Sequence, residues 1–525
     1  MATTDDTYRI DAFVSDYIDP ETFERDVIGA YGDGSAEREL PADPGVAVSW
    51  VPAATGRLRD FSTLATDIPE LDADKCVGCM ECVTECPDTA IIAKVLPETD
   101  YQNLLDKING PQGYVARQFT KTKKYYDIPQ KKGHAGGMFM LVTDPTKCKG
   151  CGECVEVCGK HDALKMVTKT EDNIGHYYDA MDVYRGLPDT PDEYIQEKIL
   201  PDMMLKQSTH LYCGGGASCM GCGEATAIRM MLAATGFVYG ENSSGIVAAT
   251  GCNTVFGATY PYNPYAVPWT NSLFENAPAV AMGIRARWNA EGNQKRRLWV
   301  LGGDGAMLDI GFQSLSRMLM SGMDIKVLVL DTQVYSNTGG QSSTSTFMGQ
   351  DAKMAAYGKV QHGKSERRKE LSQIAMMHPD VYVAQTTPAH INHFYRAVMA
   401  ANEHPGPAIV NVYTPCQPEH GISDDASSRQ AKLAVDSRAF PLLVYDPKQG
   451  ETLKSCLSLQ GNPARKEDWT KTPKGELINF ITFARTEGRF SKHFDKDGSP
   501  SRDLLKAQED RLKNWRLLQE LAGLR

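Results

Sequence analysis

Two runs of cysteines with one shared spacing limit the possible folds of this chain more than any other feature. Each run has the spacing C-x2-C-x2-C-x3-C. The first consists of Cys76, Cys79, Cys82 and Cys86, and the second of Cys148, Cys151, Cys154 and Cys158. Three thiolates at every third residue of one loop can hold three corners of an iron–sulfur cube, so the repeated run predicts two [4Fe–4S] clusters.

The two runs are expected to exchange their last ligands. In ferredoxins with two clusters, the fourth cysteine of each run binds the other cluster. One cluster is therefore expected on Cys76, Cys79, Cys82 and Cys158, and the other on Cys148, Cys151, Cys154 and Cys86. The alternative is zinc, whose sites usually present two separated cysteine pairs and leave a third cysteine without a role. Disulfides are disfavoured because tight cysteine clusters in a long intracellular chain are typical of metal sites.

Composition indicates an ordinary globular protein. The 525 residues are 42% hydrophobic and 23% charged, which excludes intrinsic disorder and a small disulfide-rich fold. The formal net charge of −10 argues against binding to a nucleic-acid backbone. The N-terminus lacks a signal-peptide pattern, and apolar stretches such as Val327–Leu330 are far shorter than a membrane span. The sequence therefore predicts a cytoplasmic protein that binds neither membranes nor nucleic acid.

A second pattern predicts a β–α–β unit with two polar loops. The apolar run at 298–302 breaks into Gly303-Asp304-Gly305, and a helical stretch then leads to a second apolar run that ends at Asp331. Strands joined in this way are usually parallel, and ligands bind outside their carboxyl ends. Both Gly303-Asp304-Gly305 and the loop 331–337 are expected at that edge.

The two loops are suited to a diphosphate bridged by Mg²⁺. This small cation prefers oxygen ligands and leaves some positions to phosphate. Asp304 offers a carboxylate, and Thr332 and the carbonyl of Val334 can complete the protein ligands. A Gly-Asp-Gly turn followed by a loop containing Asn337 matches the thiamine diphosphate motif. The alternative is an ordinary α/β loop.

Further cysteines are dispersed along the second half of the chain. Cys219 and Cys222 lie close together, Cys252 follows the apparent strand GIVAAT, and Cys416 follows AIVNVYT. These thiolates can converge if both strands are parallel and end at one edge. The alternatives are buried free thiols, or Cys213 in place of one of these ligands.

Several segments resemble the pyruvate:ferredoxin oxidoreductase family and, more broadly, the 2-oxoacid:ferredoxin oxidoreductases. They are SCMGCGEA, ATGCN, TNSLFENA, GGDGAMLDIGFQSL and DTQVYSNTGGQSS, together with Cys416. The resemblance covers residues 75–446. It implies an α/β fold: a thiamine diphosphate-binding parallel-sheet domain preceded by an α+β, two-[4Fe–4S], ferredoxin-like domain. It also implies a third [4Fe–4S] cluster on Cys219, Cys222, Cys252 and Cys416.

The resemblance extends to individual site residues. It implies thiamine diphosphate contacts from Glu224, Cys252, Gly303, Asp304, Gly305, Ala306, Thr332, Gln333, Val334, Tyr335, Ser336 and Asn337. Mg²⁺ would be held by Asp304, Thr332 and the Val334 carbonyl. Asn337 would be the catalytic residue beside the reacting carbon. Cys213 and Cys456 then have no ligand role and are expected to be structural.

The departures from the family indicate part of an enzyme. Single-chain members are about twice this length, and no pyrimidine-binding or coenzyme A-binding domain is recognised here. We therefore expect a β-type subunit, inactive alone, that joins an α-type subunit carrying those domains in an (αβ)2 assembly. The expected reaction is oxidative decarboxylation of pyruvate with coenzyme A to acetyl-CoA and CO₂, with ferredoxin or flavodoxin as electron carrier. It is potentially reversible.

Three alternatives remain beside this function. The first is that the 2-oxoacid is 2-oxoglutarate instead of pyruvate. The second is an electron-transfer subunit without thiamine chemistry. The third is a non-oxidative thiamine decarboxylase with a structural cluster.

The chain is expected to divide into five parts. They are an N-terminal arm (1–70), the ferredoxin-like domain with an insertion (71–170), a connector (171–210), the thiamine diphosphate domain with the third cluster (211–446) and a C-terminal helical extension (447–525). The arm either wraps a partner or packs against the ferredoxin domain. In the extension, Ser501 is expected to start a helix with an apolar stripe formed by Leu505, Leu512, Trp515, Leu518 and Leu521, which core packing explains better than a partner interface.

The insertion between the cysteine runs is rich in positive charge. Its basic residues are Arg117, Lys121, Lys123, Lys124, Lys131 and Lys132, against one acid, Asp127. On an acidic protein such a patch can steer an acidic electron carrier. The alternative is a solvated loop.

Overall fold

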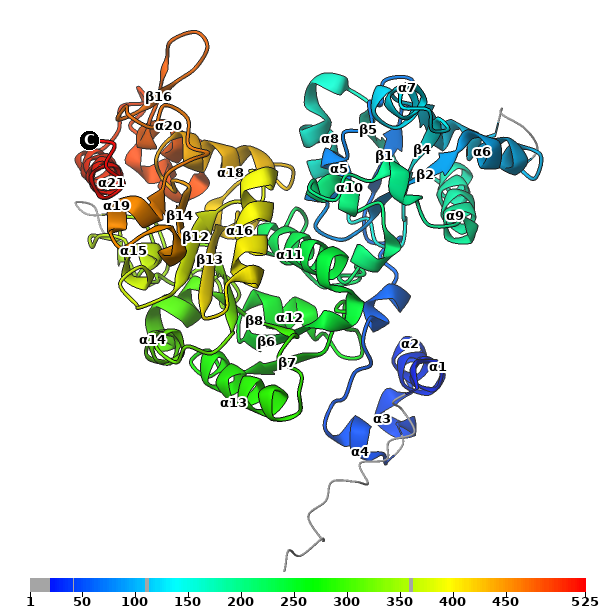
Figure 1. Ribbon diagram of the computed structural model, residues 1–525, viewed down its shortest axis with the longest axis horizontal. Helices are drawn as coiled ribbons and strands as arrows, with labels where there is room; N and C mark the ends of the chain where they lie inside the picture. Colours follow the sequence, from blue (N-terminus) through cyan, green and yellow to red (C-terminus); the bar gives the residue numbers. More distant parts are fainter. Residues whose placement is uncertain (1–18, 41, 109–112, 358–361) are drawn as a thin grey trace, which may run out of the picture.

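The computed structural model describes residues 19–40, 42–108, 113–357 and 362–525. Residues 1–18 of the expected N-terminal arm lie outside the described residues. The following residues form the short helices α1 (Pro20–Thr22), α2 (Gly29–Asp33), α3 (Ala36–Glu39) and α4 (Pro44–Ala47), which project from one corner of the molecule (Figure 1). The chain then passes between the two main domains: the Gly56 N–H donates to the Asn263 carbonyl at 2.9 Å, and Lys147 donates to the Arg57 carbonyl at 2.8 Å.

The first domain contains two small antiparallel sheets. In one, β1 (Asp67–Leu71) pairs with β5 (Leu164–Thr168); the other has the order β2 (Ile91–Pro97), β4 (Gly137–Thr143), β3 (Phe119–Lys121). Helices α5 (Glu81–Glu85) and α8 (Glu153–Cys158) pack against each other, and each contains part of one cysteine run. The insertion provides α6 (Glu98–Leu105), β3 and α7 (Ile128–Lys131). It therefore extends a sheet of this domain.

Most of the expected connector belongs to this domain as well. Helix α9 (Glu171–Gly186) begins at a capping box, in which the Thr170 and Asn173 side chains satisfy each other's backbone N–H groups. Its buried face, which includes Tyr177 and Met181, packs on the ferredoxin sheet. The short α10 (Leu200–Met203) follows.

The second domain is built on one sheet with the strand order β15-β14-β12-β13-β9-β8-β6-β7. Its strands are β6 (Ser244–Ala249), β7 (Trp269–Ser272), β8 (Arg297–Gly303), β9 (Lys326–Asp331), β12 (Tyr382–Thr386), β13 (Ala408–Tyr413), β14 (Leu443–Tyr445) and β15 (Leu457–Ser458). All neighbouring pairs from β12 to β7 are parallel, and β14 and β15 add antiparallel at one edge. The predicted parallel β–α–β unit at 298–331 is confirmed.

Helices cover both faces of this sheet (Figure 1). Leu328 and Leu330 of β9 join the core of one face with α11 (Gly223–Tyr239) and α16 (Ile391–Glu403). Val327 and Val329 join the core of the opposite face with α13 (Ala277–Ala290), α14 (Phe312–Leu319) and α15 (Leu371–Ala375). Because side chains alternate along a strand, a strand covered on both faces is apolar at every position. This explains the unbroken apolar run in β9.

The remaining elements are short, apart from the 20-residue helix α21. They are α12 (Cys252–Gly257), the hairpin β10 (Ala356–Tyr357) and β11 (His362–Gly363), α17 (Gln417–His420), α18 (Ser427–Asp436), α19 (Leu453–Cys456), the pair β16 (Thr470–Lys471) and β17 (Leu477–Ile478), α20 (Phe480–Ala484) and α21 (Arg502–Leu521). The C-terminal extension thus contains strands as well as helices. In the described part of the chain, no helix is long and apolar enough to cross a membrane.

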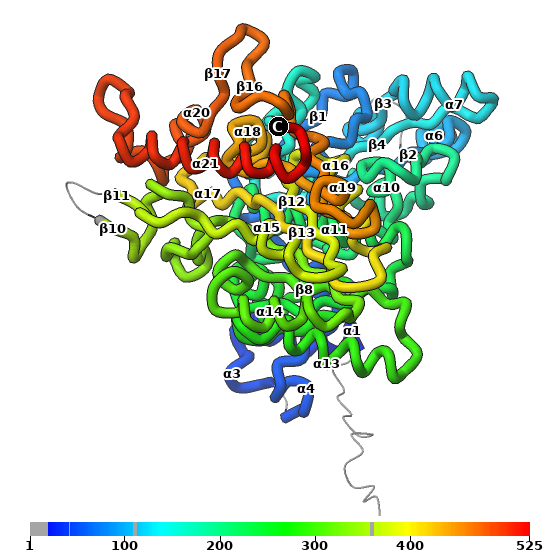
Figure 2. Tube along the Cα trace, turned by 60° about the vertical axis from the view of Figure 1, so that its left-hand side comes forward, coloured from blue at the N-terminus to red at the C-terminus, as the bar shows by residue number. Residues whose placement is uncertain are grey.

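Helix α21 packs into the second domain beside α20 (Figure 2). Ser501 caps its first turn, as expected, by accepting the Leu504 N–H at 3.2 Å. Trp515 and Leu518 are buried in the core, but Leu505 is 44% exposed and Leu504 is buried in its place. The apolar stripe therefore serves core packing. The expectation for Leu505 is wrong, because in the first turn of α21 the side chain that faces the core is that of the preceding residue, Leu504.

We predict that Trp515→Ala lowers the free energy of unfolding by about 3–5 kcal/mol, the usual cost of truncating a buried tryptophan. The indole N–H donates to the Glu467 carbonyl at 2.9 Å, and the Arg438 guanidinium lies 4.1 Å from the ring centroid. Urea denaturation measures the change. Leu505→Ala is the control and should change stability by less than about 0.5 kcal/mol. Equal effects of the two substitutions would contradict the packing described for α21.

Candidate functional site

Residues from both cysteine runs surround one cavity of the ferredoxin domain. Its wall includes Cys76, Cys79 and Cys82 from the first run and Cys158 from the second. Cys158 reaches this cavity because it ends α8, which lies against α5. The structure thus brings together the four predicted ligands of one cluster.

The second ferredoxin cavity is lined by three cysteines of the second run and one of the first. Cys148, Cys151 and Cys154 line it together with Cys86, which directly follows α5. The two runs therefore exchange their last cysteines in space, as the spacing predicts. Burial raises the pKa of the Cys148 thiol to about 12 and that of Cys76 to about 11. A thiol must lose its proton to become a metal ligand. Binding of a positively charged cluster therefore has to displace the protons of these thiols.

The spacing of these side chains suits a guest larger than one ion. In the described ranges, no group of three or more His, Cys, Asp or Glu side chains converges closely enough to hold a single metal ion. A zinc site requires four ligand atoms about 2–2.3 Å from one centre. The cysteines instead surround cavities, which fits an iron–sulfur cube and argues against zinc.

A third set of cysteines meets between the sheet edge and α11. Cys219, Cys222, Cys252 and Cys416 all line one cavity. Cys252 begins α12 after β6, and Cys416 follows β13, so parallel strands carry both to the same edge.

The two remaining cysteines do not join this set. The Cys213 thiol lies 3.5 Å from the Ala54 carbonyl and outside the cavity wall. The Cys456 thiol lies 3.2 Å from the Gly450 carbonyl. Neither position favours a ligand role, so the structure supports the expected set over one that includes Cys213.

The three cavities share a local sequence signal that the spacing alone does not show. Each contains a C-x-G-C turn: 76–79, 148–151 and 219–222. The glycine has a positive φ in every case, 68° at Gly78, 75° at Gly150 and 66° at Gly221. A side chain is strained in this left-handed conformation, which turns the backbone so that both cysteines face one point. The motif identifies the third loop as equivalent to the two ferredoxin loops.

The expected Mg²⁺ ligands meet at the carboxyl ends of two neighbouring strands. In the register of β8 and β9, Gly303 pairs with Leu330, so the loops that follow are adjacent. Asp304 Oδ1 accepts the Thr332 N–H at 3.2 Å. The Thr332 hydroxyl oxygen lies 3.2 Å from the same Oδ1 and 3.1 Å from the Val334 carbonyl oxygen, and it can donate its one proton to either. A carboxylate, a hydroxyl and a carbonyl form the oxygen donor set that suits Mg²⁺.

The other oxygen of Asp304 has partners that sequence reasoning missed. Ser343 and Ser345 donate to Oδ2 at 2.5 and 2.8 Å. The segment that contains both serines is rich in Ser and Thr. This composition is compatible with such contacts, but it is equally compatible with an exposed turn. Burial raises the pKa of Asp304 to about 7, and the nearby Asp331 adds to the shift. A cation at this carboxylate would offset both effects.

A cofactor cavity lies beside these ligands. Among the expected thiamine diphosphate contacts, Glu224, Cys252, Gly303, Gly305, Ala306, Thr332, Val334, Tyr335, Ser336 and Asn337 line it. Asp304 lies behind the wall, where it contacts Thr332. Gln333 is not in the wall: its side chain carbonyl accepts from Arg489 at 3.0 Å, away from the cavity. The lining also includes Thr250, Gly251, Phe274 and Thr338, which sequence reasoning did not select.

Glu224 is the acid of this cavity. It is 4% exposed, and its Oε2 has no hydrogen-bond partner within the described residues. Burial raises its pKa to about 8, with a further contribution from Asp304. A buried polar atom without a partner is costly. A donor or acceptor on a bound cofactor would satisfy it, so the cavity fits the expected guest.

The cofactor cavity and the third cysteine cavity share a wall. Glu224, Cys252, Thr332 and Asn337 line both. His420 strengthens the connection: its Nδ1 lies 3.4 Å from the Cys416 N–H and its Nε2 lies 2.9 Å from the Thr332 carbonyl. Because Nδ1 accepts, the proton is on Nε2, which donates to Thr332. One buried imidazole thus bridges a cysteine of one cavity and a ligand candidate of the other.

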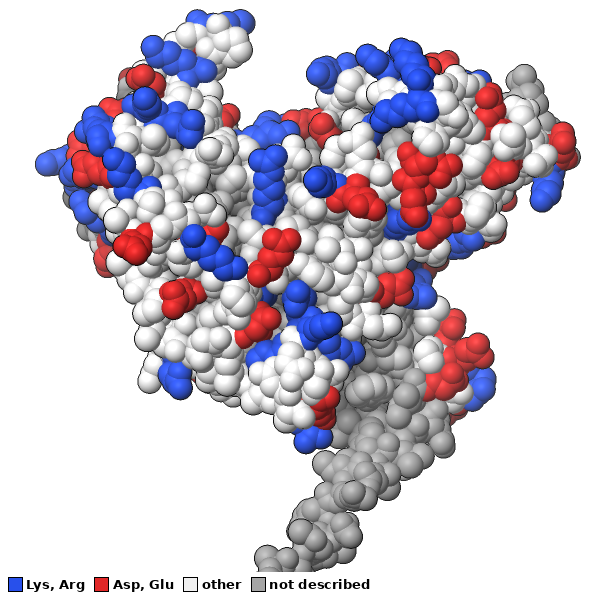
Figure 3. Space-filling model, in the orientation of Figure 1, with Lys and Arg blue, Asp and Glu red and all other residues white. Residues whose placement is uncertain are grey.

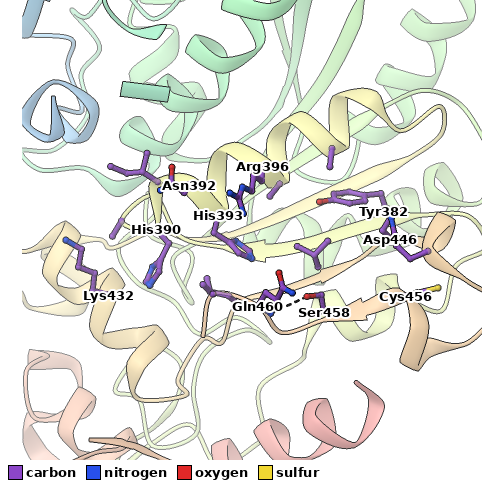
Figure 4. A pocket seen from close by; sticks show the side chains of 18 of the residues that line it. Tyr382, His390, Asn392, His393, Arg396, Lys432, Asp446, Cys456, Ser458 and Gln460 are labelled. Atoms are coloured by element: carbon purple, nitrogen blue, oxygen red, sulfur yellow. Dashed lines mark hydrogen bonds between the residues drawn. The ribbon is translucent and has the colours of Figure 1, made fainter. Parts of the chain in front are cut away.

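A large cavity with a volume of about 810 Å³ lies elsewhere (Figure 4). It opens between α5, α16, α18 and the β14–β15 edge. Arg396 and Lys432 contribute positive charges to its lining, and Glu81, Glu85 and Asp446 contribute carboxyl groups. Of the expected cysteine, Mg²⁺ and thiamine ligands, none lines it.

Comparisons with known proteins match both domains. Residues 249–412 match the model described as "Thiamine pyrophosphate enzyme, C-terminal TPP binding domain", and residues 75–164 match the "4Fe-4S dicluster domain". These matches and the observed sheets confirm the predicted fold class. The chain therefore has a domain for thiamine pyrophosphate and a domain for two 4Fe–4S clusters.

Similar proteins are longer than this chain. The pyruvate-flavodoxin oxidoreductase of Rhodospirillum rubrum is 28% identical over 578 aligned residues, which cover 95% of this chain and 44% of the relative. The pyruvate:ferredoxin oxidoreductase of Moorella thermoacetica is 27% identical over 501, which cover 80% and 39%. A solved 2-oxoglutarate:ferredoxin oxidoreductase of Magnetococcus marinus matches 39% of this chain and 65% of its own, at 21% identity and a TM-score of 0.34. The chain thus spans less than half the length of both curated relatives.

We predict that Cys416→Ser removes one cluster, whereas Cys213→Ser does not. Of these two cysteines, only Cys416 lines the third cavity, and a four-iron cluster without one thiolate is expected to be lost. The variant should contain about two thirds of the wild-type iron, measured by iron analysis after anaerobic purification. The matched control Cys213→Ser should keep the wild-type content. Iron loss in the control instead of in Cys416→Ser would contradict the assigned ligands.

Proposed function

Because this chain belongs to the family of the pyruvate:ferredoxin and 2-oxoacid:ferredoxin oxidoreductases, we propose that it forms the thiamine-binding, electron-transferring β-type part of such an enzyme. The proposed reaction converts a 2-oxoacid and coenzyme A to acyl-CoA and CO₂. It releases two electrons, which leave one at a time to ferredoxin or flavodoxin. Pyruvate is the proposed substrate, since the two curated relatives named above carry it in their names.

This proposal rests on one observation: the cofactor cavity and the third cysteine cavity share a wall. An electron-transfer subunit without thiamine chemistry has no use for a cavity lined by Glu224 and Asn337. A non-oxidative decarboxylase has no use for three cluster sites. A thiamine site with a cluster site directly behind it is suited to two successive one-electron oxidations.

The residues around the cofactor cavity have separate proposed tasks. When bound, thiamine diphosphate supplies an electron sink for decarboxylation of the 2-oxoacid. Asp304, Thr332 and the Val334 carbonyl would hold Mg²⁺, which would supply positive charge for the diphosphate. Asn337 lines both the cofactor cavity and the third cysteine cavity, where it would lie beside the reacting groups as the proposed catalytic residue.

A further domain is proposed to cover this site and to bring the missing pyrimidine-binding, substrate-binding and coenzyme A-binding groups. Large apolar side chains next to the two cavities are exposed: Met220 by 41%, Val255 by 50% and Leu273 by 62%. Met220 lies between Cys219 and Cys222 in the third cysteine loop, so exposed apolar side chains lie directly beside the site. Exposed apolar side chains grouped in this way are typical of interfaces. We propose an α-type partner subunit in an (αβ)2 assembly.

The assembled complex tests the function directly. With coenzyme A present and pyruvate or 2-oxoglutarate offered in turn, we expect carrier reduction with pyruvate. Asp304→Ala should abolish turnover and Mg²⁺-dependent retention of thiamine diphosphate, because it removes the only carboxylate of the ligand set. Electron paramagnetic resonance should still detect the ferredoxin-type clusters.

Asp446→Ala is the control for this substitution, since Asp446 lines the large cavity away from the site. It should keep wild-type turnover. Full activity of Asp304→Ala would refute the assignment of the thiamine site. Aldehyde release without an electron acceptor would instead favour the non-oxidative decarboxylase.

The basic insertion is a candidate surface for the electron carrier. Lys and Arg side chains gather over α7 in Figure 3. Lys124 is bound to the buried Asp202, and Lys121 pairs with Glu98 at 2.7 Å. Lys123, Lys131 and Lys132 are exposed and, within the described chain, make no ion pair. They are therefore the better positions for a test than Lys124.

We predict that reversing the charge of Lys123, Lys131 and Lys132 to Glu slows carrier reduction about tenfold at low salt and weakens its salt dependence. The physical reason is the loss of long-range attraction to an acidic carrier. Stopped-flow reduction of the carrier across ionic strengths measures the effect.

The matched control reverses Lys466, Lys471 and Lys474, which are exposed on the C-terminal extension. It changes the net charge by the same amount at a distant place, so it separates a local from a global effect. Equal slowing in both triple variants would contradict a docking role for the insertion.

A further inference from the structure

A buried lysine lies where two cysteine cavities approach each other. Lys149 stands between Cys148 and Cys151 and lines the second ferredoxin cavity. Its Nζ lies 2.7 Å from Oδ1 of Asp88, which lines the same cavity two residues after Cys86. This ion pair is therefore part of the wall around the second ferredoxin cavity.

The same ammonium group reaches the third cavity. It donates to the Ser218 carbonyl at 2.8 Å and to the Ser218 hydroxyl oxygen at 3.0 Å. Ser218 directly precedes Cys219, and both line the third cavity. With Asp88 as the remaining acceptor, all three N–H donors of the ammonium are used. Lys149 is thereby fixed between the two cavities and ties their loops together.

Solvent is largely excluded from this ion pair. The side chains of Lys149 and Asp88 are 9% and 4% exposed, and the ring centroid of Phe61 lies 5.2 Å from Nζ. Desolvation of two charges offsets most of their attraction, so stability is a poor explanation for such a pair. A buried charge is screened much less than a surface charge. Each member of the pair therefore acts strongly on whatever occupies the neighbouring cavities.

We propose that Lys149 and Asp88 tune the reduction potential of the cluster in the second ferredoxin cavity, and that Lys149 also holds the third cysteine loop at a fixed distance from it. Lys149 is thus a positioning residue for electron transfer between the two cavities. The inference rests on the proposed function, because it requires clusters in both.

The step that the pair serves is a transfer of one electron from the cluster in the third cavity to the cluster in the second ferredoxin cavity. The former is oxidised, the latter is reduced, and no bond or proton is exchanged. Net charge near a cluster is one of the determinants of its potential. Lys149 favours the more negative, reduced form and raises the potential, and Asp88 opposes it and lowers the potential.

The test measures midpoint potentials of the holoenzyme complex by redox titration followed with electron paramagnetic resonance. Lys149→Met should shift one cluster to a lower potential, and Asp88→Asn should shift the same cluster to a higher one. The opposite signs follow from the opposite charges removed. Lys149→Arg keeps the charge and should stay near the wild-type value. Lys466→Met, on the exposed C-terminal extension, is the control and should shift nothing.

The double variant Lys149→Met/Asp88→Asn covers the case in which Lys149→Met alone does not fold. It leaves no unpaired buried charge, and its potential should lie closer to the wild type than that of either single variant. The inference would be overturned if Lys149→Met and Asp88→Asn shifted the midpoint potential in the same direction, because a general loosening of the structure would affect both variants alike. It would also be overturned if neither substitution shifted the potential.

The same titration separates failure of this inference from failure of the proposed function. Wild-type protein with three clusters but unmoved potentials in the variants contradicts only the role of Lys149 and Asp88. Wild-type protein with two clusters, by iron content and paramagnetic resonance, contradicts the proposed function and this inference with it.

Discussion

The parallel alignment of four neighbouring strands is the constraint on which the site depends. β13, β9, β8 and β6 lie side by side and all end at one edge of the sheet. Their carboxyl ends deliver Cys416, Thr332, Asp304 and Cys252 in that order. Residues from four distant parts of the sequence therefore meet without a long loop, and an oxygen ligand set forms next to a thiol set because their strands are neighbours.

The buried titratable groups at this edge are suited to binding cations. Burial raises the pKa of Asp304 to about 7, that of Glu224 to about 8 and that of the Cys416 thiol to about 12. Folding alone therefore makes these groups harder to ionise, since a low dielectric disfavours the charged form. Cations that bind there must compete with protons. The binding of Mg²⁺ and of iron is accordingly expected to release protons and to stabilise the folded chain.

Contacts between the two domains hold the cysteine cavities in place. From α11, Arg229 donates to the Val83 carbonyl at 2.6 Å, within the first cysteine run. On the other side, the Glu153 carboxylate accepts the N–H groups of Ser427 and Ser428 at 3.0 and 2.8 Å. These buried polar contacts, together with the Lys149 bridge, are satisfied only in one relative placement of the domains. Electron transfer benefits from such rigidity, because its rate depends on the separation of the centres.

The sequence by itself determined what depends on short spacings: the cysteine runs with their exchanged last cysteines, the Gly303-Asp304-Gly305 turn, and the unbroken apolar run of β9. Tertiary structure alone decided the contacts between distant segments. Ser343 and Ser345 as partners of Asp304, the exclusion of Cys213 from the third cavity and the reach of Lys149 to Ser218 are of this kind. The reason is physical. A few residues of backbone fix local geometry, whereas contacts across the chain depend on how whole strands and helices pack.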